Sequence, residues 1–117
     1  MNTKGCEAEA IALQLLLKNQ LKLLTSNYSC RFGEIDLIML DRSILVFIEV
    51  RARSSLKFGG AAVSVNKQKQ QKIITTARHF LLCNSKYNLS TCRFDVVALE
   101  TSSAENTPVW YKDAFRL

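Results

Sequence analysis

The sequence predicts a mixed α/β layer fold in which one helix is followed by three strands, a second helix and a further strand. Two segments repeat apolar residues at the spacing of an amphipathic helix, and three others are rich in Ile, Val and Leu over the length of a strand. The chain has 117 residues, which is enough for one core but not for two. We therefore expect residues 1–117 to form a single domain.

The predicted elements follow one another with mostly short connections. In order, they are a helix at 4–18, strands at 21–29, 34–40 and 44–53, a helix at 66–83, a strand at 91–99 and a short element at 109–115. Ala8, Ala12 and Leu16 repeat on one face of the first helix. The first strand has a weak pattern, whereas the next two are strongly apolar and are joined tightly around Asp41-Arg42-Ser43, as in a hairpin.

The second half is predicted from a cap and an apolar stripe. Asn66 is a good N-cap, and Ile73, Ala77 and Phe80 recur on one face of the helix that follows it. Loops are expected at 54–64, which contains glycine, and at 101–107, which is polar. The resulting order corresponds to a mixed sheet layered with helices.

Charge is divided unevenly along the chain. The net charge is +6, and the segment from Val50 to Phe94 holds nine basic residues and no acid, so all ten acids lie outside it. Such a basic stretch favours a polyanionic partner, with nucleic acid ahead of an acidic membrane surface.

Cysteine usage and apolar runs exclude several classes of protein. The four cysteines contain no Cys-x-x-Cys pair and are accompanied by a single histidine, so a structural zinc site is not expected. No secretory signal is evident, since Glu7 and Glu9 lie where such a signal is basic, and reduced thiols in the cytoplasm are expected. The longest apolar run, 44–48, is too short to span a bilayer.

Two acids interrupt the apolar hairpin. Asp36 and Glu49 lie among residues typical of strands that are buried on both faces, where an unpaired carboxylate is costly. If the turn is a two-residue loop at Arg42-Ser43, the two acids lie opposite each other, with Cβ atoms about 4.5–5.5 Å apart. A hard cation such as Mg²⁺ would relieve their repulsion, whereas a structural ion pair between Glu49 and Arg51 is the alternative.

Two further residues extend this pattern. Glu9 lies at the edge of the apolar stripe of the first helix, where it is either a third acid of the site or a solvated first-turn acid. Lys69 continues the inward stripe of the second helix, where it either reaches an acidic cluster or an anionic ligand, or extends outward to solvent. Asp95, in the last strand of the core, is expected to pair structurally with Arg93 or Arg78.

The chain resembles the YraN-type family of bacterial proteins over nearly its whole length. The matching motifs are, in order, Gly5-x-x-x-Glu9-x-x-Ala12, Asn27, Gly33-Glu34-Ile35-Asp36-Leu37-Ile38, Val46-Phe47-Ile48-Glu49-Val50-Arg51, Phe58-Gly59, Val65-x-x-x-Lys69, Ala77-Arg78-x-Phe80-Leu81, Arg93-Phe94-Asp95-Val96 and Trp110-x-x-x-Ala114-Phe115. That family is similar in fold to the PD-(D/E)XK nucleases, including the archaeal Holliday-junction resolvases. The resemblance thus implies a restriction-endonuclease-like αβββαβ core.

The resemblance also implies a metal-dependent site. Asp36 and Glu49 would hold Mg²⁺, or Mn²⁺ in its place, together with the carbonyl of Val50, while Glu9 would act directly or through water. The nuclease pattern has Lys where this chain has Arg51, and an arginine cannot act as a general base because it stays protonated. Arg51 and Lys69 would instead stabilise charge on the phosphate. The residues expected to contact flanking phosphates are Arg53, Lys57, Lys67, Lys72 and Arg78.

Two functions from different classes follow. The first is an endonuclease that hydrolyses phosphodiester bonds and selects nucleic-acid structure, with DNA favoured over RNA. The second is a nucleic-acid-binding module that has the same fold but weak or no catalysis, which the absent motif Lys favours. By analogy with the resolvases, the chain could form a homodimer.

Overall fold

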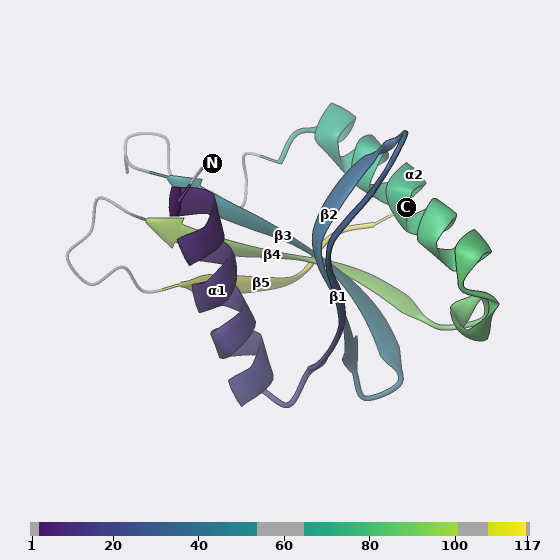
Figure 1. The fold of residues 1–117 in the computed structure, drawn as a ribbon, viewed down its shortest axis with the longest axis horizontal. Helices are drawn as coiled ribbons and strands as arrows, with labels where there is room; N and C mark the ends of the chain where they lie inside the picture. The colour runs from purple at the N-terminus through teal and green to yellow at the C-terminus, as the bar shows by residue number, and fades with distance from the viewer. Residues whose placement is uncertain (1–2, 54–64, 101–107, 117) are drawn as a thin grey trace.

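The computed structural model describes residues 3–53, 65–100 and 108–116, and these residues form one mixed sheet with a helix on each face (Figure 1). The elements are α1 (Thr3–Lys18), β1 (Lys22–Cys30), β2 (Gly33–Asp41), β3 (Ile44–Arg53), α2 (Lys67–Cys83), a short 3-10 helix η2 (Ser85–Tyr87), β4 (Cys92–Glu100) and β5 (Val109–Phe115). The α/β class and the αβββαβ order predicted from the sequence are confirmed, and β5 follows them. The predicted loops at 54–64 and 101–107 lie outside the described residues.

The sheet has the strand order β1-β2-β3-β4-β5. β3 and β4 are parallel and the other neighbouring strands are antiparallel. A parallel pair needs a long crossover, which α2 and its flanking segments provide here. The turn between β2 and β3 is the predicted two-residue loop, in which Arg42 has a left-handed φ of 59°, and the pairs Asp41–Ile44 to Leu37–Ile48 confirm the predicted register.

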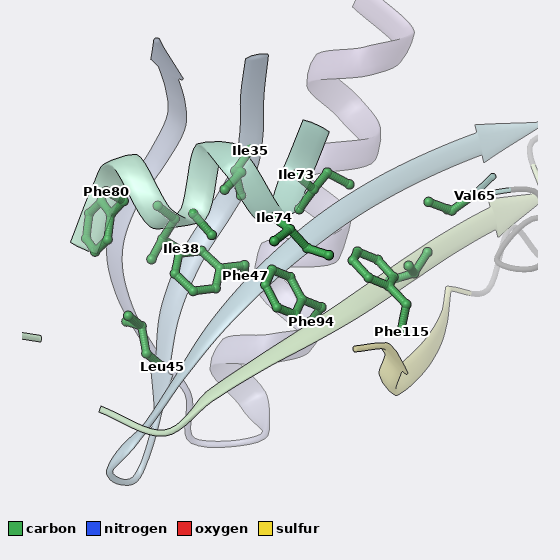
Figure 2. Packing of buried hydrophobic residues seen from close by; sticks show 12 residues of the cluster. Ile35, Ile38, Leu45, Phe47, Val65, Ile73, Ile74, Phe80, Phe94 and Phe115 are labelled. Carbon is green, nitrogen blue, oxygen red and sulfur yellow. The ribbon is translucent and has the colours of Figure 1, made fainter. Parts of the chain in front are cut away.

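α2 packs on one face of the sheet through a core in which aromatic rings form a row. The row comprises Phe80 of α2, Phe47 of β3, Phe94 of β4 and Phe115 of β5, with neighbouring ring centroids 5.1–6.0 Å apart (Figure 2). The predicted Asn66 cap is confirmed, since its Oδ1 accepts a hydrogen bond from the Lys69 N–H at 2.8 Å. This cap fixes where α2 begins, and therefore where its first lysines lie relative to the sheet.

α1 covers the other face. Ala8, Ala12 and Leu16 are buried against apolar side chains of β2, β3 and β4, as the helical periodicity predicts. The small side chains of Ala8 and Ala12 allow the helix to approach the sheet closely. None of the described helices is long and apolar enough to cross a bilayer.

A buried ionic network ties β4 to β5 and to the end of β2. Asp95 is fully buried and accepts hydrogen bonds from Arg93 through Nε and Nη2 at 2.9 and 3.0 Å, from Trp110 Nε1 at 2.9 Å and from the backbone N–H of Asp113 at 2.9 Å. Arg93 also pairs with Asp41 at 3.1 Å. The predicted structural pairing of Asp95 with Arg93 is therefore confirmed.

Because Asp95 satisfies four donor groups at once, removing its carboxylate leaves two N–H groups without this acceptor and leaves the largely buried Arg93 guanidinium with Asp41 as its remaining ion-pair partner. We predict that Asp95→Ala lowers the free energy of unfolding by about 3–5 kcal/mol, measured by urea titration. Arg116→Ala removes an exposed ion pair and should leave the urea midpoint unchanged. Equal midpoints for Asp95→Ala and the wild type would contradict this role for the network.

Candidate functional site

The two hairpin acids lie next to each other at the point where β2 and β3 stop pairing. The last paired position is Leu37–Ile48, and Asp36 and Glu49 are the next residues on each strand. Asp36 Oδ2 accepts a hydrogen bond from the Val50 N–H at 2.8 Å. The Asp36 side chain thus accepts the hydrogen bond from Val50 that a backbone carbonyl of β2 would accept if the ladder continued.

Glu49 faces α2, on the same side of the sheet as Phe47. Its side chain is 8% exposed, and Lys69 Nζ lies 3.3 Å from Glu49 Oε2. Lys69 reaches it because the residue continues the inward stripe of α2 at the N-terminal end of the helix. Of the two alternatives for Lys69, contact with an acidic cluster is therefore the one that the structure shows.

The neighbours of Glu49 shift the pKa of its carboxyl. Burial, together with hydrogen bonding to and repulsion from Asp36, raises the pKa of the Glu49 carboxyl to about 8, although Lys69 opposes the shift. Near neutral pH the pair therefore holds a proton in the absence of any other cation. A cation placed between the two carboxylates would release this proton and remove the repulsion.

Glu9 approaches the pair from α1, on the other face of the sheet. Burial and then repulsion from Asp36 raise the pKa of its carboxyl, and Glu34 adds to the repulsion. A hydrogen bond with the Asn27 side chain acts in the opposite direction. Glu9 is therefore close enough to Asp36 to interact with it electrostatically, which a purely solvated first-turn acid would not do.

Asn27 and Glu34 complete the surroundings of Glu9, although the sequence motifs gave neither residue a role. Asn27 has a left-handed φ of 54° and lies opposite Asp36, between the paired positions Ser26–Leu37 and Tyr28–Ile35. Asparagine tolerates this conformation better than most residues. The sequence signal for this contact is that Asn27, an asparagine inside a strand, is one of the positions that match the YraN-type family.

The remaining predicted residues belong to β3 and α2, or lie outside the described residues. Arg51 is half-buried on β3, two residues beyond Glu49 and on the same side of the strand. Lys67, Lys72 and Arg78 are exposed on α2. Only the backbone of Arg53 is described, at the end of β3, and Lys57 lies outside the described residues.

The donor set suits a hard divalent cation that is held by few protein ligands. Asp36 and Glu49 offer carboxylate oxygens side by side, and Mg²⁺ commonly binds one or two carboxylates while it keeps several waters. The described residues contain no group of three or more acids, histidines or cysteines arranged to hold a metal ion. The roles of Glu9 and of the Val50 carbonyl as further ligands therefore stay predictions.

The unusual pKa of Glu49 has a consequence for stability. In the unfolded chain this carboxyl loses its proton near pH 4.5, whereas the folded protein holds the proton to about pH 8. The folded state thus binds more protons across this interval, so the free energy of unfolding falls as the pH rises from about 5 to 8 and levels off above 8.

We predict that Glu49→Gln, which cannot ionise, escapes this loss. In a buffer with chelator, its stability relative to the wild type should grow by roughly a few kcal/mol between pH 5 and pH 8, measured by urea unfolding at several pH values. Glu7→Gln, at an exposed position on α1, is the matched control and should follow the wild type. A difference between Glu49→Gln and the wild type that stays constant with pH would contradict the assignment.

Comparison with known proteins identifies relatives over nearly the whole chain. A family model described as "Uncharacterised protein family UPF0102" matches residues 8–99. A UPF0102 protein of Psychromonas ingrahamii is 50% identical over 115 residues, which cover 98% of this chain and 91% of the relative. UPF0102 proteins of Saccharophagus degradans and Methylobacillus flagellatus are 50% and 45% identical and cover 99% and 98% of this chain, and 95% and 98% of the relatives.

The region matched by the family model contains every residue of the site described above, from Glu9 to Lys69. The resemblance to the YraN-type family is thereby confirmed. The names of these relatives state the family and no activity, so what the site does has to be argued from its chemistry.

Proposed function

Because this chain belongs to the family UPF0102, whose description names no reaction, we propose from the geometry of its site that it is a metal-dependent nuclease. The observation that carries the proposal is the adjacent pair Asp36 and Glu49, placed against Lys69 at the start of a basic helix. Perturbed carboxylates beside a cation are typical of catalytic sites. The substrate that this arrangement fits is a phosphodiester of nucleic acid, with DNA favoured over RNA.

The acids would hold the ion and the cations would hold the phosphate. Asp36 and Glu49 would bind Mg²⁺, or Mn²⁺ in its place, with Glu9 and the Val50 carbonyl as the additional ligands. When bound, such an ion neutralises charge on the phosphodiester and makes a water molecule more acidic. Asp36 is already oriented for this role by the Val50 N–H, which fixes one carboxylate oxygen at 2.8 Å.

Lys69 and Arg51 carry the positive charge of the proposed reaction. Lys69 Nζ now contacts Glu49, and it would be released to donate to a phosphate oxygen once the ion shares that carboxylate. Arg51 stays protonated, so its role is to stabilise the charge that develops on the phosphorus oxygens. The attacking water would lose its proton to solvent or to Glu9, since neither cation can accept it.

The exposed cations of α2 supply non-specific affinity. Lys67, Lys72 and Arg78 project from one helix, and Arg53 and Lys57 belong to the same acid-free stretch. Such residues neutralise phosphates and position a strand without reading its bases. The proposed nuclease is therefore selective for structure rather than for sequence.

A second function remains in competition because the site is partly neutralised without metal. Lys69 already offsets the negative charge that remains on the Asp36–Glu49 pair, and Arg51 occupies the position at which the nuclease pattern has Lys. Both features suit a nucleic-acid-binding module that lacks chemistry. The two functions differ in whether the acids are needed for activity and in whether they bind metal.

We predict that Mg²⁺ raises the thermal unfolding temperature of the wild type and that Asp36→Asn abolishes this shift. The asparagine keeps an oxygen that can accept from Val50 but loses the charge that the ion requires. Cleavage of flapped or branched DNA in Mg²⁺ should fall by about two orders of magnitude or more in Asp36→Asn and Glu49→Gln. Glu7→Gln is the control for a lost exposed acid.

The outcomes separate the two candidates. Metal binding and cleavage that are both lost in Asp36→Asn support the nuclease. Salt-sensitive binding of nucleic acid by a wild type that neither binds metal nor cleaves would leave only the binding module. Full cleavage by either variant would overturn the proposed roles of the two acids.

The phosphate footprint on α2 is tested by salt dependence. We predict that Lys67→Ala and Lys72→Ala each reduce the slope of log Kobs against log salt concentration by about 0.9, because each would release one fewer counterion. Lys18→Ala, at the exposed end of α1 and outside the acid-free stretch, is the control and should leave the slope unchanged. Unchanged slopes in the two α2 variants would place the footprint elsewhere.

A further inference from the structure

An exposed aromatic residue lies beside the proposed site, at the turn between β1 and β2. Phe32 is 39% exposed, although it is among the large apolar side chains that proteins usually bury. It lines an open hollow of about 290 Å³ together with Gln68, Gln71, Lys72 and Thr75 of α2. The hollow therefore combines one aromatic ring with amide groups and a cation.

The glycine that follows Phe32 brings this turn against the helix. Gly33 has a φ of +150°, and a Cβ on it would lie 3.1 Å from Thr76 Oγ1 and 3.9 Å from Lys72 Cβ. A side chain at this position would crowd Thr76, and the positive φ favours glycine. The close approach holds Phe32 next to the helix, where its ring also meets that of His79 edge-on, with centroids 6.1 Å apart.

The chemistry of the hollow matches an unpaired nucleobase and an adjacent phosphate. A base presents a flat face that stacks on an aromatic ring, and its edge offers donors and acceptors that Gln68 and Gln71 can pair with. The Arg31 guanidinium lies over one face of the Phe32 ring, 4.8 Å from its centroid, and adds a second cation to Lys72. A base would stack on the other face of the ring or take the place of this guanidinium. A nucleotide paired inside a duplex would present neither a free face nor a free Watson–Crick edge to such a hollow.

The hollow lies along α2 from the residue that contacts the acids. Lys69 contacts Glu49, and Lys72, which lines the hollow, lies three residues further along the same helix, about 4.5 Å along the axis. A strand that follows α2 with one phosphate at the acids would therefore bring a nearby nucleotide to the hollow.

We propose that this hollow is a subsite for an unpaired nucleobase next to the scissile phosphate, with Phe32 as its stacking platform. The inference rests on the proposed nuclease function and adds the feature of the substrate that is recognised, namely a strand with unstacked bases. It gives a physical basis for selection of structure over sequence, since every base has a face that can stack.

The test measures binding in chelator, without cleavage. Oligonucleotides that carry 2-aminopurine, either in a single-stranded flap or fully paired in a duplex, are titrated with the protein, in DNA and RNA versions. The wild type should bind the flap more tightly than the duplex and quench its fluorescence by stacking. Phe32→Leu should weaken flap binding by about tenfold or more and remove the quenching, while duplex binding and the salt slope are unchanged.

Two variants control for folding and for apolar surface. Phe32→Tyr keeps the ring and should restore flap binding and quenching. Leu89→Ala removes another exposed apolar side chain, on the segment after η2, and should behave as the wild type. Because Phe32 is partly exposed and Leu keeps its apolar character, the thermal unfolding temperature of Phe32→Leu should stay close to that of the wild type.

The results distinguish the two proposals. Equal flap binding by Phe32→Leu and the wild type would overturn the subsite even if Asp36→Asn abolishes cleavage. A wild type that binds neither flap nor duplex would overturn the proposed function itself. Loss of flap preference in Phe32→Leu with retained duplex binding would establish the subsite whether or not the acids catalyse.

Discussion

Asp36 and Glu49 lie side by side where the pairing of β2 and β3 ends, and the groups around them balance the repulsion between these two carboxylates. The Val50 N–H binds Asp36, Lys69 binds Glu49, and a raised pKa keeps a proton on the pair. Two like charges would be unfavourable inside a continuous ladder. At the end of the ladder, Asp36 is hydrogen-bonded by a backbone N–H of β3 and Glu49 is paired with a lysine of α2. These interactions make the position suitable for a cation and a phosphate.

The two faces of the sheet contribute different chemistry to this position. α1 brings Glu9, which interacts with Asp36 and is held by Asn27, whereas α2 brings Lys69 and the exposed lysines. Acidic side chains and Lys69 thus meet where β2 and β3 stop pairing. A nucleic-acid strand lying along α2 would have its phosphates near the cations and one of them near the acids.

The buried network around Asp95 serves a different purpose from the site acids. Its carboxylate is fully buried, and its acceptors are occupied by Arg93, Trp110 and a backbone N–H. Arg93 and Asp95 therefore form a closed structural pair, whereas Glu49 is paired with Lys69, whose side chain is 40% exposed. The two acids differ in how many hydrogen-bond donors surround them. Asp95 is fully hydrogen-bonded and stabilises the fold, whereas Glu49 can still bind a ligand.

The sequence by itself determined the helices and the strands and, given a two-residue turn, the hairpin register, because apolar periodicity, a tight turn and an N-cap act locally. It left the partner of Asp95 open between Arg93 and Arg78, and the structure shows Arg93. The sequence also indicated that Asp36 and Glu49 would meet and that Lys69 would face inward, since both follow from the period of a strand or helix. Only the tertiary structure decided which partner Lys69 takes, that Asn27 and Glu34 surround Glu9, and that Phe32 borders a hollow on α2. These contacts join segments far apart in the chain, and they depend on close approaches, such as that of Gly33 to Thr76, which no local pattern encodes.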